Sequence, residues 1–363
     1  MSTGQARPAD ALAGRVVRWQ RQHGRTDLPW QGSRDPYRVW LSEIMLQQTQ
    51  VATVRGYFAR FVERFPTVAA LAEAPAEDVL ALWSGLGYYA RARHLHRAAQ
   101  VVMAEHGGAF PTSAAALATL PGIGRSTAAA IAAFCFGERV AILDGNVKRV
   151  LTRALAFDGD LAEAAAERAL WARAEMLLPT GGTGEIEAYT QGLMDLGATV
   201  CLARKPACDA CPLAEICVAR AAGTPERFPV KTRKLKRSRR ANALLWLQRG
   251  ERVWLVRRAD RGVWAQLWSL PEFASAEALE AAVANWPGTL EWLPPFVHVL
   301  THFDWQLEPL RLALSEPVPA PVREAIEALA LHGEPGRWVA RSELDALGLP
   351  APVRRLLDAG LPA

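Results

Sequence analysis

The sequence predicts two domains, a mainly α-helical domain followed by a smaller α/β domain. Its 363 residues exceed the roughly 250 residues at which a single hydrophobic core usually stops growing. Apolar residues recur every three or four positions in the first two thirds of the chain and every second position later. Four of the five cysteines lie within seventeen residues between these regions, which indicates a metal centre at the end of the helical domain.

Composition limits the class of protein and its partners. Half of the residues are hydrophobic, but no apolar run approaches the roughly 20 residues that a membrane-spanning helix needs. No secretory segment opens the chain, so we expect a cytoplasmic protein without a membrane partner. The net charge of +5 and the isoelectric point near 9.1 fit an anionic partner, of which nucleic acid is the commonest.

Helices are predicted wherever apolar residues recur at three- and four-residue spacing between glycine and proline breaks. These segments are Ala69–Trp83, Ala90–Glu105, Ser113–Leu120, Ala128–Phe136 and Leu161–Leu178.

The stretch Leu120-Pro-Gly-Ile-Gly-Arg-Ser-Thr127 predicts a helix-hairpin-helix. Gly122 and Gly124 would let the backbone turn tightly, so that N–H groups at a helix N-terminus point at a phosphate oxygen. Such a contact would not depend on DNA sequence. The alternative is an ordinary corner between two helices.

Glu43 is the first candidate catalytic residue, because cleavage of a glycosidic bond commonly needs a proton donor and an anionic stabiliser. Val39 and Leu46 share its helical face in Val39-Trp-Leu-Ser-Glu-Ile-Met-Leu46. An apolar setting should raise its pKa and keep a proton available. The alternative is a carboxylate satisfied by the amide of Gln47.

Asp144 is the second candidate. It follows the apolar run Val140-Ala-Ile-Leu143 and precedes Gly145-Asn-Val-Lys-Arg149, which places it at the entrance of a helix. There the helix dipole and amide donors would keep the carboxylate ionised. The alternative is a plain N-cap, and both roles can hold together.

The cysteines Cys201, Cys208, Cys211 and Cys217 suit either zinc or an iron–sulfur cluster. Structural zinc usually takes two short pairs, whereas here only the middle pair is close, so the spacing favours a [4Fe–4S] cluster. Disulfides are the remaining alternative.

The domain boundary is predicted at Lys231-Thr-Arg-Lys-Leu-Lys-Arg-Ser-Arg-Arg240, a basic run without an acid. We expect a helical domain over 1–224, a linker over 225–240 and an α/β domain over 241–363. The run is either a solvated linker or a contact for DNA phosphates. Strands are predicted at Ala243–Gln248, Arg252–Arg257 and Leu307–Leu314, and helices at Ser275–Ala284 and Val353–Leu356.

Several long motifs in the first two thirds of the chain closely resemble the MutY family of adenine DNA glycosylases, within the endonuclease III-like superfamily. They are Leu28-Pro-Trp30, Asp35-Pro-Tyr-Arg-Val-Trp-Leu-Ser-Glu-Ile-Met-Leu-Gln-Gln-Thr-Gln-Val51, Trp83-Ser-Gly-Leu-Gly-Tyr-Tyr-Ala-Arg-Ala-Arg93, the hairpin, Ile142-Leu-Asp-Gly-Asn-Val-Lys-Arg149, Met194-Asp-Leu-Gly197 and the cysteine loop.

The resemblance implies an enzyme that flips adenine mispaired with 8-oxoguanine, or with guanine, out of double-stranded DNA and hydrolyses its glycosidic bond. By similarity, Glu43 would protonate adenine N7, Asp144 would stabilise the cationic sugar and Asn146 would help to orient the catalytic carboxylate. The resemblance places Leu28, Trp30 and Glu187 in the adenine pocket, and Gln48, Thr49, Leu86 and Tyr88 in the opened duplex beside 8-oxoguanine. For Tyr88 the alternative is ordinary core packing.

Ser126 occupies the position where the related endonuclease III-like lyases carry a Schiff-base lysine. A hydroxyl cannot form an imine, so we expect base removal without efficient strand cleavage.

The last third of the chain resembles the Nudix-like 8-oxoguanine recognition domain of the same family through Gly262-Val-Trp-Ala-Gln-Leu-Trp-Ser-Leu-Pro271. No Arg-Glu-x-x-Glu-Glu run follows Pro271, so we expect no nucleotide hydrolysis. His298-Val-Leu-Thr-His-Phe303 resembles the recognition loop, in which Thr301 and His302 would read the lesion. The alternative for His302 is a core turn.

The sequence thus predicts a mainly α helix-hairpin-helix DNA glycosylase domain with a [4Fe–4S] cluster loop and a C-terminal α/β Nudix-like domain, acting as a monomer. Two rivals are a bifunctional glycosylase/lyase, which Ser126 opposes, and a non-catalytic lesion sensor, which Glu43 and Asp144 together oppose.

Overall fold

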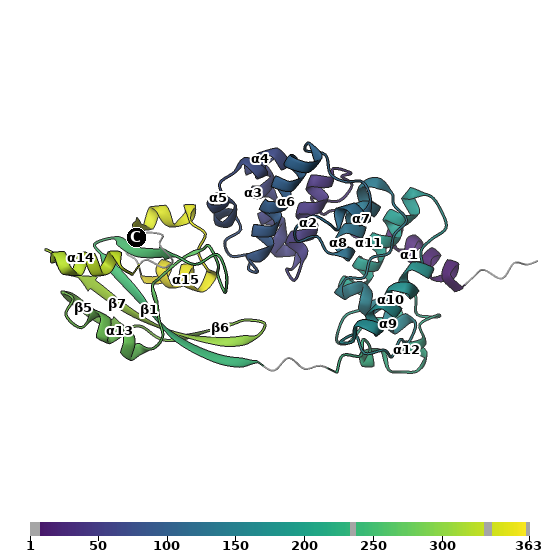
Figure 1. Ribbon diagram of the computed structural model, residues 1–363. Coiled ribbons are helices and arrows are strands. Elements are labelled where there is room, and N and C mark those ends of the chain that lie inside the picture. The colour runs from purple at the N-terminus through teal and green to yellow at the C-terminus, as the bar shows by residue number, and fades with distance from the viewer. Residues whose placement is uncertain (1–7, 233–236, 330–335, 361–363) are drawn as a thin grey trace, which may run out of the picture. The chain divides into compact units, whose positions relative to one another are not determined.

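The computed structural model describes residues 8–232, 237–329 and 336–360 (Figure 1). The chain divides into two compact units. The first takes in Met1–Ala72 and Arg97–Lys234, and the second takes in Glu73–His96 and Leu235–Ala363. A short segment of the predicted helical domain therefore groups with the C-terminal residues. The boundaries predicted from the sequence stay a prediction.

Residues 8–232 form helices joined by loops. In chain order they are α1 (Pro8–His23), α2 (Pro36–Leu46), α3 (Val51–Arg64), α4 (Val68–Glu73), α5 (Ala76–Leu82), α6 (Ala90–His106), α7 (Ala114–Leu117), α8 (Arg125–Phe136), α9 (Gly145–Ala154), α10 (Ala164–Met176), α11 (Thr183–Thr199), α12 (Val218–Ala221) and the short 3-10 turns η1 (Cys208–Ala210) and η2 (Pro225–Arg227). No helix in the part of the chain that the structure describes is long and apolar enough to cross a bilayer.

Local sequence explains where several helices begin and end. Asp35 caps α2 by accepting a hydrogen bond from the Tyr37 amide, and Pro36 occupies the first helical position. Gly137 ends α8 in a left-handed conformation, with φ of 66°. The segment predicted as one helix over Ala69–Trp83 is two helices, because Pro75 disfavours helical geometry at the residue before it.

The core of the first unit forms where α1, α8, α9 and α11 pack together. Helix α8 buries Ala128–Ala133, in which every residue except Ile131 is alanine, and small side chains let neighbouring helices approach closely. Figure 1 shows α8, α9, α10 and α11 in teal beside α1. This packing brings the end of α2 and the start of α9 to one pocket.

The C-terminal part of the second unit is a twisted sheet with helices. The strands are β1 (Ser238–Arg249), β2 (Arg252–Arg257), β3 (Trp268–Ser269), β4 (Glu272–Phe273), β5 (Gly288–Trp292), β6 (Phe296–Val299), β7 (Phe303–Leu314) and β8 (Arg337–Ala340), and the helices are α13 (Ala276–Val283), α14 (Ala320–Glu327), α15 (Ala351–Gly360) and the 3-10 helix η3 (Arg341–Ala346). The main path runs β3-β2-β1-β7-β5.

Strands β1 and β7 form the centre of this sheet and run parallel, from Ser238 opposite Phe303 to Gln248 opposite Ala313. The predicted strands at 243–248, 252–257 and 307–314 therefore lie within β1, β2 and β7. Strand β1 begins at Ser238, inside the range predicted as linker, and residues 233–236 of the basic run lie outside the described residues.

Side chains of the segment Glu73–His96 donate hydrogen bonds to backbone carbonyls in the C-terminal residues of the same unit. The hydroxyls of Ser84 and Tyr89 both donate to the carbonyl oxygen of Leu349, at 2.8 and 2.9 Å. Arg93 Nη1 donates to the carbonyl of Ala265 at 3.1 Å. These bonds form between residues far apart in the sequence, and no local pattern predicts them.

Candidate active site

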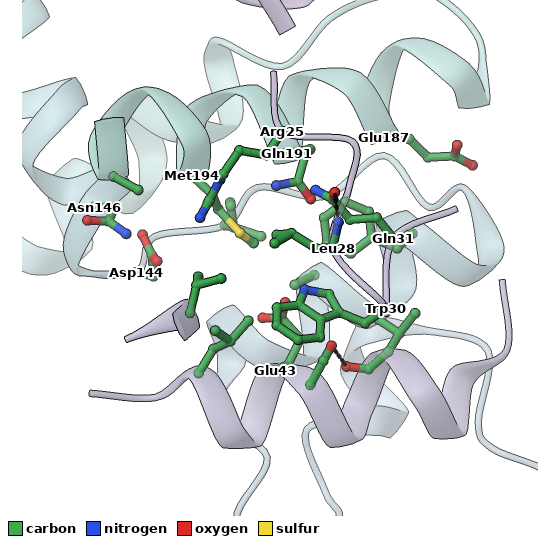
Figure 2. A pocket seen from close by; sticks show the side chains of 18 of the residues that line it. Arg25, Leu28, Trp30, Gln31, Glu43, Asp144, Asn146, Glu187, Gln191 and Met194 are labelled. Carbon is green, nitrogen blue, oxygen red and sulfur yellow. Dashed lines mark hydrogen bonds between the residues drawn. The ribbon is translucent and has the colours of Figure 1, made fainter. Parts of the chain in front are cut away.

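The first unit contains a large pocket, lined by both polar and apolar side chains, between α2, the loop over residues 25–34, and helices α8, α9 and α11. Six residues predicted as catalytic or adenine-binding line it (Figure 2): Leu28, Trp30, Glu43, Asp144, Asn146 and Glu187. The structure thus brings together residues that are up to about 160 positions apart in sequence.

Glu43 projects from the middle of α2 toward this pocket, between the buried residues Ser42 and Ile44. Burial and, after it, the negative charge of Asp144 together raise its pKa to about 8. Gln47, the neighbour named in the alternative explanation, donates to Thr127 Oγ1 at 3.3 Å. Glu43 is therefore placed to hold a proton at neutral pH.

Asp144 is the N-cap of α9, where its Oδ1 accepts a hydrogen bond from the Val147 amide at 2.7 Å. Burial raises the pKa of its carboxyl, while the amides of Val147 and Asn146 and the charge of Arg149 lower that pKa. Burial outweighs these donors, so the pKa of Asp144 is raised above its ordinary value, contrary to the expectation that the amides and the helix dipole would keep the carboxyl fully ionised. No hydrogen-bond donor is among the causes that act on the pKa of Glu43, whereas two amides lower that of Asp144, so Glu43 holds a proton more readily than Asp144 does.

Asn146 is fixed beside Asp144 by Arg149. The side-chain oxygen of Asn146 accepts from Arg149 Nη2 at 2.8 Å, and the same guanidinium donates to the carbonyls of Gly197 and Cys201. One arginine therefore joins the start of α9, the end of α11 and the first cysteine of the loop.

Gly197 in α11 lies against Asn146, and a Cβ added to it would come within 2.5 Å of Asn146 Cβ. We expect Gly197→Ala to force α9 and α11 apart, to destabilise the protein by about 1–3 kcal/mol and to slow base removal by displacing Asp144. Thermal melting and single-turnover rates would show both effects. Gly56→Ala in α3 is the matched control, because its Cβ would meet nothing within 4 Å and alanine favours a helix.

Leu28 and Trp30 form an apolar wall of the pocket, with 6% and 7% of their surfaces exposed. The Trp30 ring packs edge-on against Phe58, at 5.4 Å between ring centroids. Glu187 lies farther out: its carboxylate points away from Glu43 and Asp144 in Figure 2 and pairs with Arg34 Nη2 at 2.7 Å.

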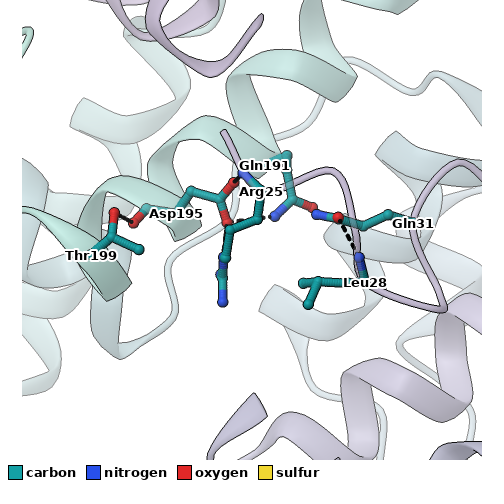
Figure 3. Close-up of polar contacts among 6 residues, drawn as sticks. All are labelled: Arg25, Leu28, Gln31, Gln191, Asp195 and Thr199. Carbon is teal, nitrogen blue, oxygen red and sulfur yellow. Dashed lines mark hydrogen bonds and ion pairs between the residues drawn. The ribbon is translucent and has the colours of Figure 1, made fainter. Parts of the chain in front are cut away.

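A buried polar network behind this wall was not predicted. Asp195 is fully buried in α11 and accepts hydrogen bonds from the Arg25 amide, from Arg25 Nε and from Gln191 Nε2, at 2.8 to 2.9 Å (Figure 3). The Leu28 amide is held by Gln31 Oε1 in the same loop. A carboxylate within the apolar helix motif Met194-Asp-Leu-Gly197 was the available signal, since a buried charge is paired.

Ser126 also lines the pocket, and its Oγ accepts from the Leu143 amide at 3.1 Å. Gln48 and Thr49 line the pocket where α2 ends, and Gln48 has a left-handed φ of 58°. In the hairpin, Gly122 has φ of 76°, which requires glycine, whereas Gly124 has φ of −80° and is the N-cap of α8. The conformational argument therefore holds for Gly122 alone.

Leu86 and Tyr88 belong to the second unit. Leu86 is buried, but Tyr88 is 50% exposed and has a left-handed φ of 48°, so the core-packing alternative for Tyr88 is wrong. Thr301 and His302 are exposed in the turn between β6 and β7, so the core-turn alternative for His302 is also wrong.

Cys201, Cys208, Cys211 and Cys217 line one cavity beside Val150, Arg153 and Leu196. All five cysteines of the chain are free, which excludes the disulfide alternative. No group of three or more potential ligands among the described residues converges on one metal ion. A cluster of several irons, each bound by one thiolate, fits four cysteines spread around a cavity.

Two arginines of α9, Arg149 and Arg153, donate hydrogen bonds to backbone carbonyls of this cysteine loop. Arg153 is almost fully buried and donates to the carbonyls of Leu202 and Ala203, and its Nη1 lies 3.4 Å from Cys201 Sγ. Hydrogen bonds to the sulfurs are one means by which a protein tunes an iron–sulfur centre.

Comparison with known proteins identifies the family. An adenine DNA glycosylase of Buchnera aphidicola is 34% identical over 347 residues, which cover 94% of this chain and 95% of that protein. The chain belongs to the adenine DNA glycosylase family. The human adenine DNA glycosylase is 33% identical over 375 residues, covering 85% of this chain and 68% of the human protein.

Family models and a solved structure agree with this membership of the adenine DNA glycosylases. Residues 41–176 match the HhH-GPD superfamily of base excision DNA repair proteins, 201–217 the iron–sulfur binding domain of endonuclease III, and 242–359 the NUDIX domain. A thermostable thymine-DNA glycosylase is similar in structure, with a TM-score of 0.53 and 28% identity over 59% of this chain and 97% of that one.

The predicted fold class and the enzyme class are thereby confirmed. The adenine DNA glycosylase is a base excision repair hydrolase that acts on DNA and holds a [4Fe–4S] cluster. The match at 201–217 sets the zinc alternative aside.

Proposed function

We propose that this adenine DNA glycosylase removes adenine paired with 8-oxoguanine or guanine, with Glu43 as general acid and Asp144 as stabiliser of the cationic sugar. The observation that carries the proposal is that both carboxylates line one pocket with an apolar wall, while the pKa of Glu43 is raised to about 8.

In this proposal Glu43 donates its proton to adenine N7 and makes the base a better leaving group. Leu28 and Trp30 hold the flipped base and exclude water from its faces. Apolar surroundings keep the acid protonated until it gives the proton to the base, as burial of a carboxyl generally does.

Asp144 then faces the positive charge that develops on the sugar. Its oxygen is already held by the Val147 amide at 2.7 Å, so little reorganisation is needed when the charge appears. Asn146 and Arg149 keep the start of α9 in place.

We assign recognition of the mispair to residues of both units. Tyr88 would enter the opened duplex with Leu86 beside it, and Gln48 and Thr49 would contact the gap. The Thr301 hydroxyl and His302 would read 8-oxoguanine from their exposed turn. Gly122 and Gly124 would bring hairpin amides to a phosphate.

Ser126 supports hydrolysis without strand cleavage. Its hydroxyl lines the pocket and accepts from the Leu143 amide, and it cannot form an imine with the sugar. The bound cluster would supply a fixed structural centre, around which Arg204 and Lys205 face phosphates. We propose that the enzyme acts as a monomer in the cytoplasm.

The test is single-turnover cleavage of duplexes that carry 8-oxoguanine–adenine, guanine–adenine or 8-oxoguanine–cytosine, with free base scored apart from strand breaks. We expect adenine release from the first two duplexes, faster from the first, and no strand break before alkali. Thr301→Val should reduce the preference for 8-oxoguanine and leave the guanine–adenine rate unchanged. Strong strand cleavage by the purified enzyme would contradict the proposal.

A further inference from the structure

Arg91 in α6 is buried, with 9% of its surface exposed, and burial lowers the pKa of its guanidinium to about 10. Burying a cation is unfavourable unless its donors are satisfied. Its Nη2 donates to the carbonyl oxygens of Leu86 and Gly87, at 3.3 and 3.1 Å. The buried guanidinium therefore donates its hydrogen bonds to the backbone of the loop that ends at Tyr88.

Two aromatic rings lie against the same guanidinium. Its central carbon is 5.3 Å from the ring centroid of Trp83 and 5.6 Å from that of Tyr88. Trp83 Nε1 also donates to the carbonyl of Gly87, at 3.1 Å. The carbonyl of Gly87 therefore accepts hydrogen bonds from Trp83, which precedes the loop in sequence, and from Arg91, which follows it.

The loop backbone needs such support because of its conformation. Gly85, Gly87 and Tyr88 all have positive φ, of 94°, 76° and 48°. A left-handed tyrosine is unfavourable and persists only where its surroundings determine the conformation. Tyr88 nevertheless remains 50% exposed, so the loop is held at its base while the ring is left open to solvent.

We propose that Arg91 is a positioning residue that holds loop 84–88 in the conformation that presents the Tyr88 ring to DNA. The inference rests on the proposed contact of Tyr88 with the opened duplex. Arg91 itself need not touch DNA, because it acts through the carbonyls of Leu86 and Gly87 and through the face of the Tyr88 ring. Lysine keeps the charge but lacks the planar guanidinium that lies against the two rings while its Nη2 bonds both carbonyls.

The experiment is a double-mutant cycle between Arg91→Lys and Tyr88→Ala, with full-length protein. The probe is a duplex with 8-oxoguanine opposite 2′-fluoro-2′-deoxyadenosine, which resists cleavage, and the readout is its dissociation constant. Arg97→Lys is the matched control, because Arg97 is exposed on the same helix. Circular dichroism and the iron content check that each variant is folded and loaded.

We expect Tyr88→Ala to weaken binding about tenfold, and Arg91→Lys about fivefold, because alanine removes the ring on which a base stacks and lysine leaves that ring less well held. In the Tyr88→Ala background, Arg91→Lys should add less than about twofold, because a residue that acts through Tyr88 has nothing left to position. Arg97→Lys should leave the affinity unchanged.

If Arg91→Lys weakens binding by the same factor in the wild type and in Tyr88→Ala, the inference is overturned, while the proposed contact of Tyr88 with DNA is not. Tyr88→Ala without effect would overturn both. Should Arg91→Lys fail to fold, Gly87→Ala replaces it: its Cβ would meet nothing within 4 Å, so it changes only the backbone preference at a left-handed position. Its loss of affinity should likewise vanish in the Tyr88→Ala background, and persistence there would overturn the inference.

Discussion

Glu43→Gln is expected to lower the single-turnover rate of adenine release by a factor of about 10²–10⁴, the usual contribution of a positioned general acid. Glutamine has the same shape but no acidic proton. DNA binding should survive, because Glu43 forms part of a pocket wall that glutamine can also form. Rates and affinities measured on the same 8-oxoguanine–adenine duplex would separate the two effects, and a near-normal rate would show that Glu43 is not the acid.

The same substitution should stabilise the fold at neutral and higher pH. The folded-state pKa of Glu43 lies near 8, above the ordinary 4.5, so the folded protein holds this proton more tightly than the unfolded chain does. The stability that comes with the proton is complete below about pH 4.5 and is lost as the pH rises toward 8. The melting temperature of Glu43→Gln should therefore exceed that of the wild type by a margin that widens over this range.

The wild-type rate should follow the protonation of the same carboxyl. We expect a plateau below about pH 8 and a decline above it, because the general acid is then deprotonated. This pH profile and the melting curves report one pKa by two independent measurements.

Asp144→Asn is expected to slow adenine release by a factor on the order of 10² or more, because the anion that faces the cationic sugar is lost. Asparagine caps helices as well as aspartate does, so the bond to the Val147 amide and the start of α9 should be kept. Removal of this negative charge should also lower the pKa of Glu43, since that charge helps to raise it. The decline of any residual rate should then begin at lower pH.

Asp35→Asn is the matched control for Asp144→Asn. Asp35 also caps a helix with its side chain, by accepting from the Tyr37 amide at 3.0 Å, but it does not line the pocket. An equal loss of rate in both variants would assign the effect of Asp144→Asn to helix capping, and a loss confined to Asp144→Asn would assign it to the charge.

Glu43 and Asp144 could be found from sequence because each has a strong local signal. The sequence alone shows that Glu43 lies on an apolar helical face and that Asp144 lies at the start of a helix. The network of Arg25, Gln191 and Asp195 could not be found, since it depends on how α11 packs against a loop 170 residues away.

Glu187 is a second example of what the sequence alone cannot predict. It lies one helical turn before Gln191 on the same helix, and both residues line the pocket. Sequence spacing cannot say which of the two faces the base, because that depends on the rotation of α11 about its axis. The single helix predicted over Ala69–Trp83 was wrong although Pro75 is a local signal for a helix break, because the apolar spacing continues on both sides of it.

The carbonyl oxygen of Leu349 receives two hydroxyl groups, from Ser84 and Tyr89, which flank the loop that carries Tyr88. Every residue has a backbone carbonyl oxygen whatever its side chain, so many substitutions at position 349 would keep both hydrogen bonds. The path of the backbone at that point is what must be retained. Chimeras that exchange C-terminal halves between relatives would therefore succeed or fail by backbone alignment at this position rather than by sequence matching.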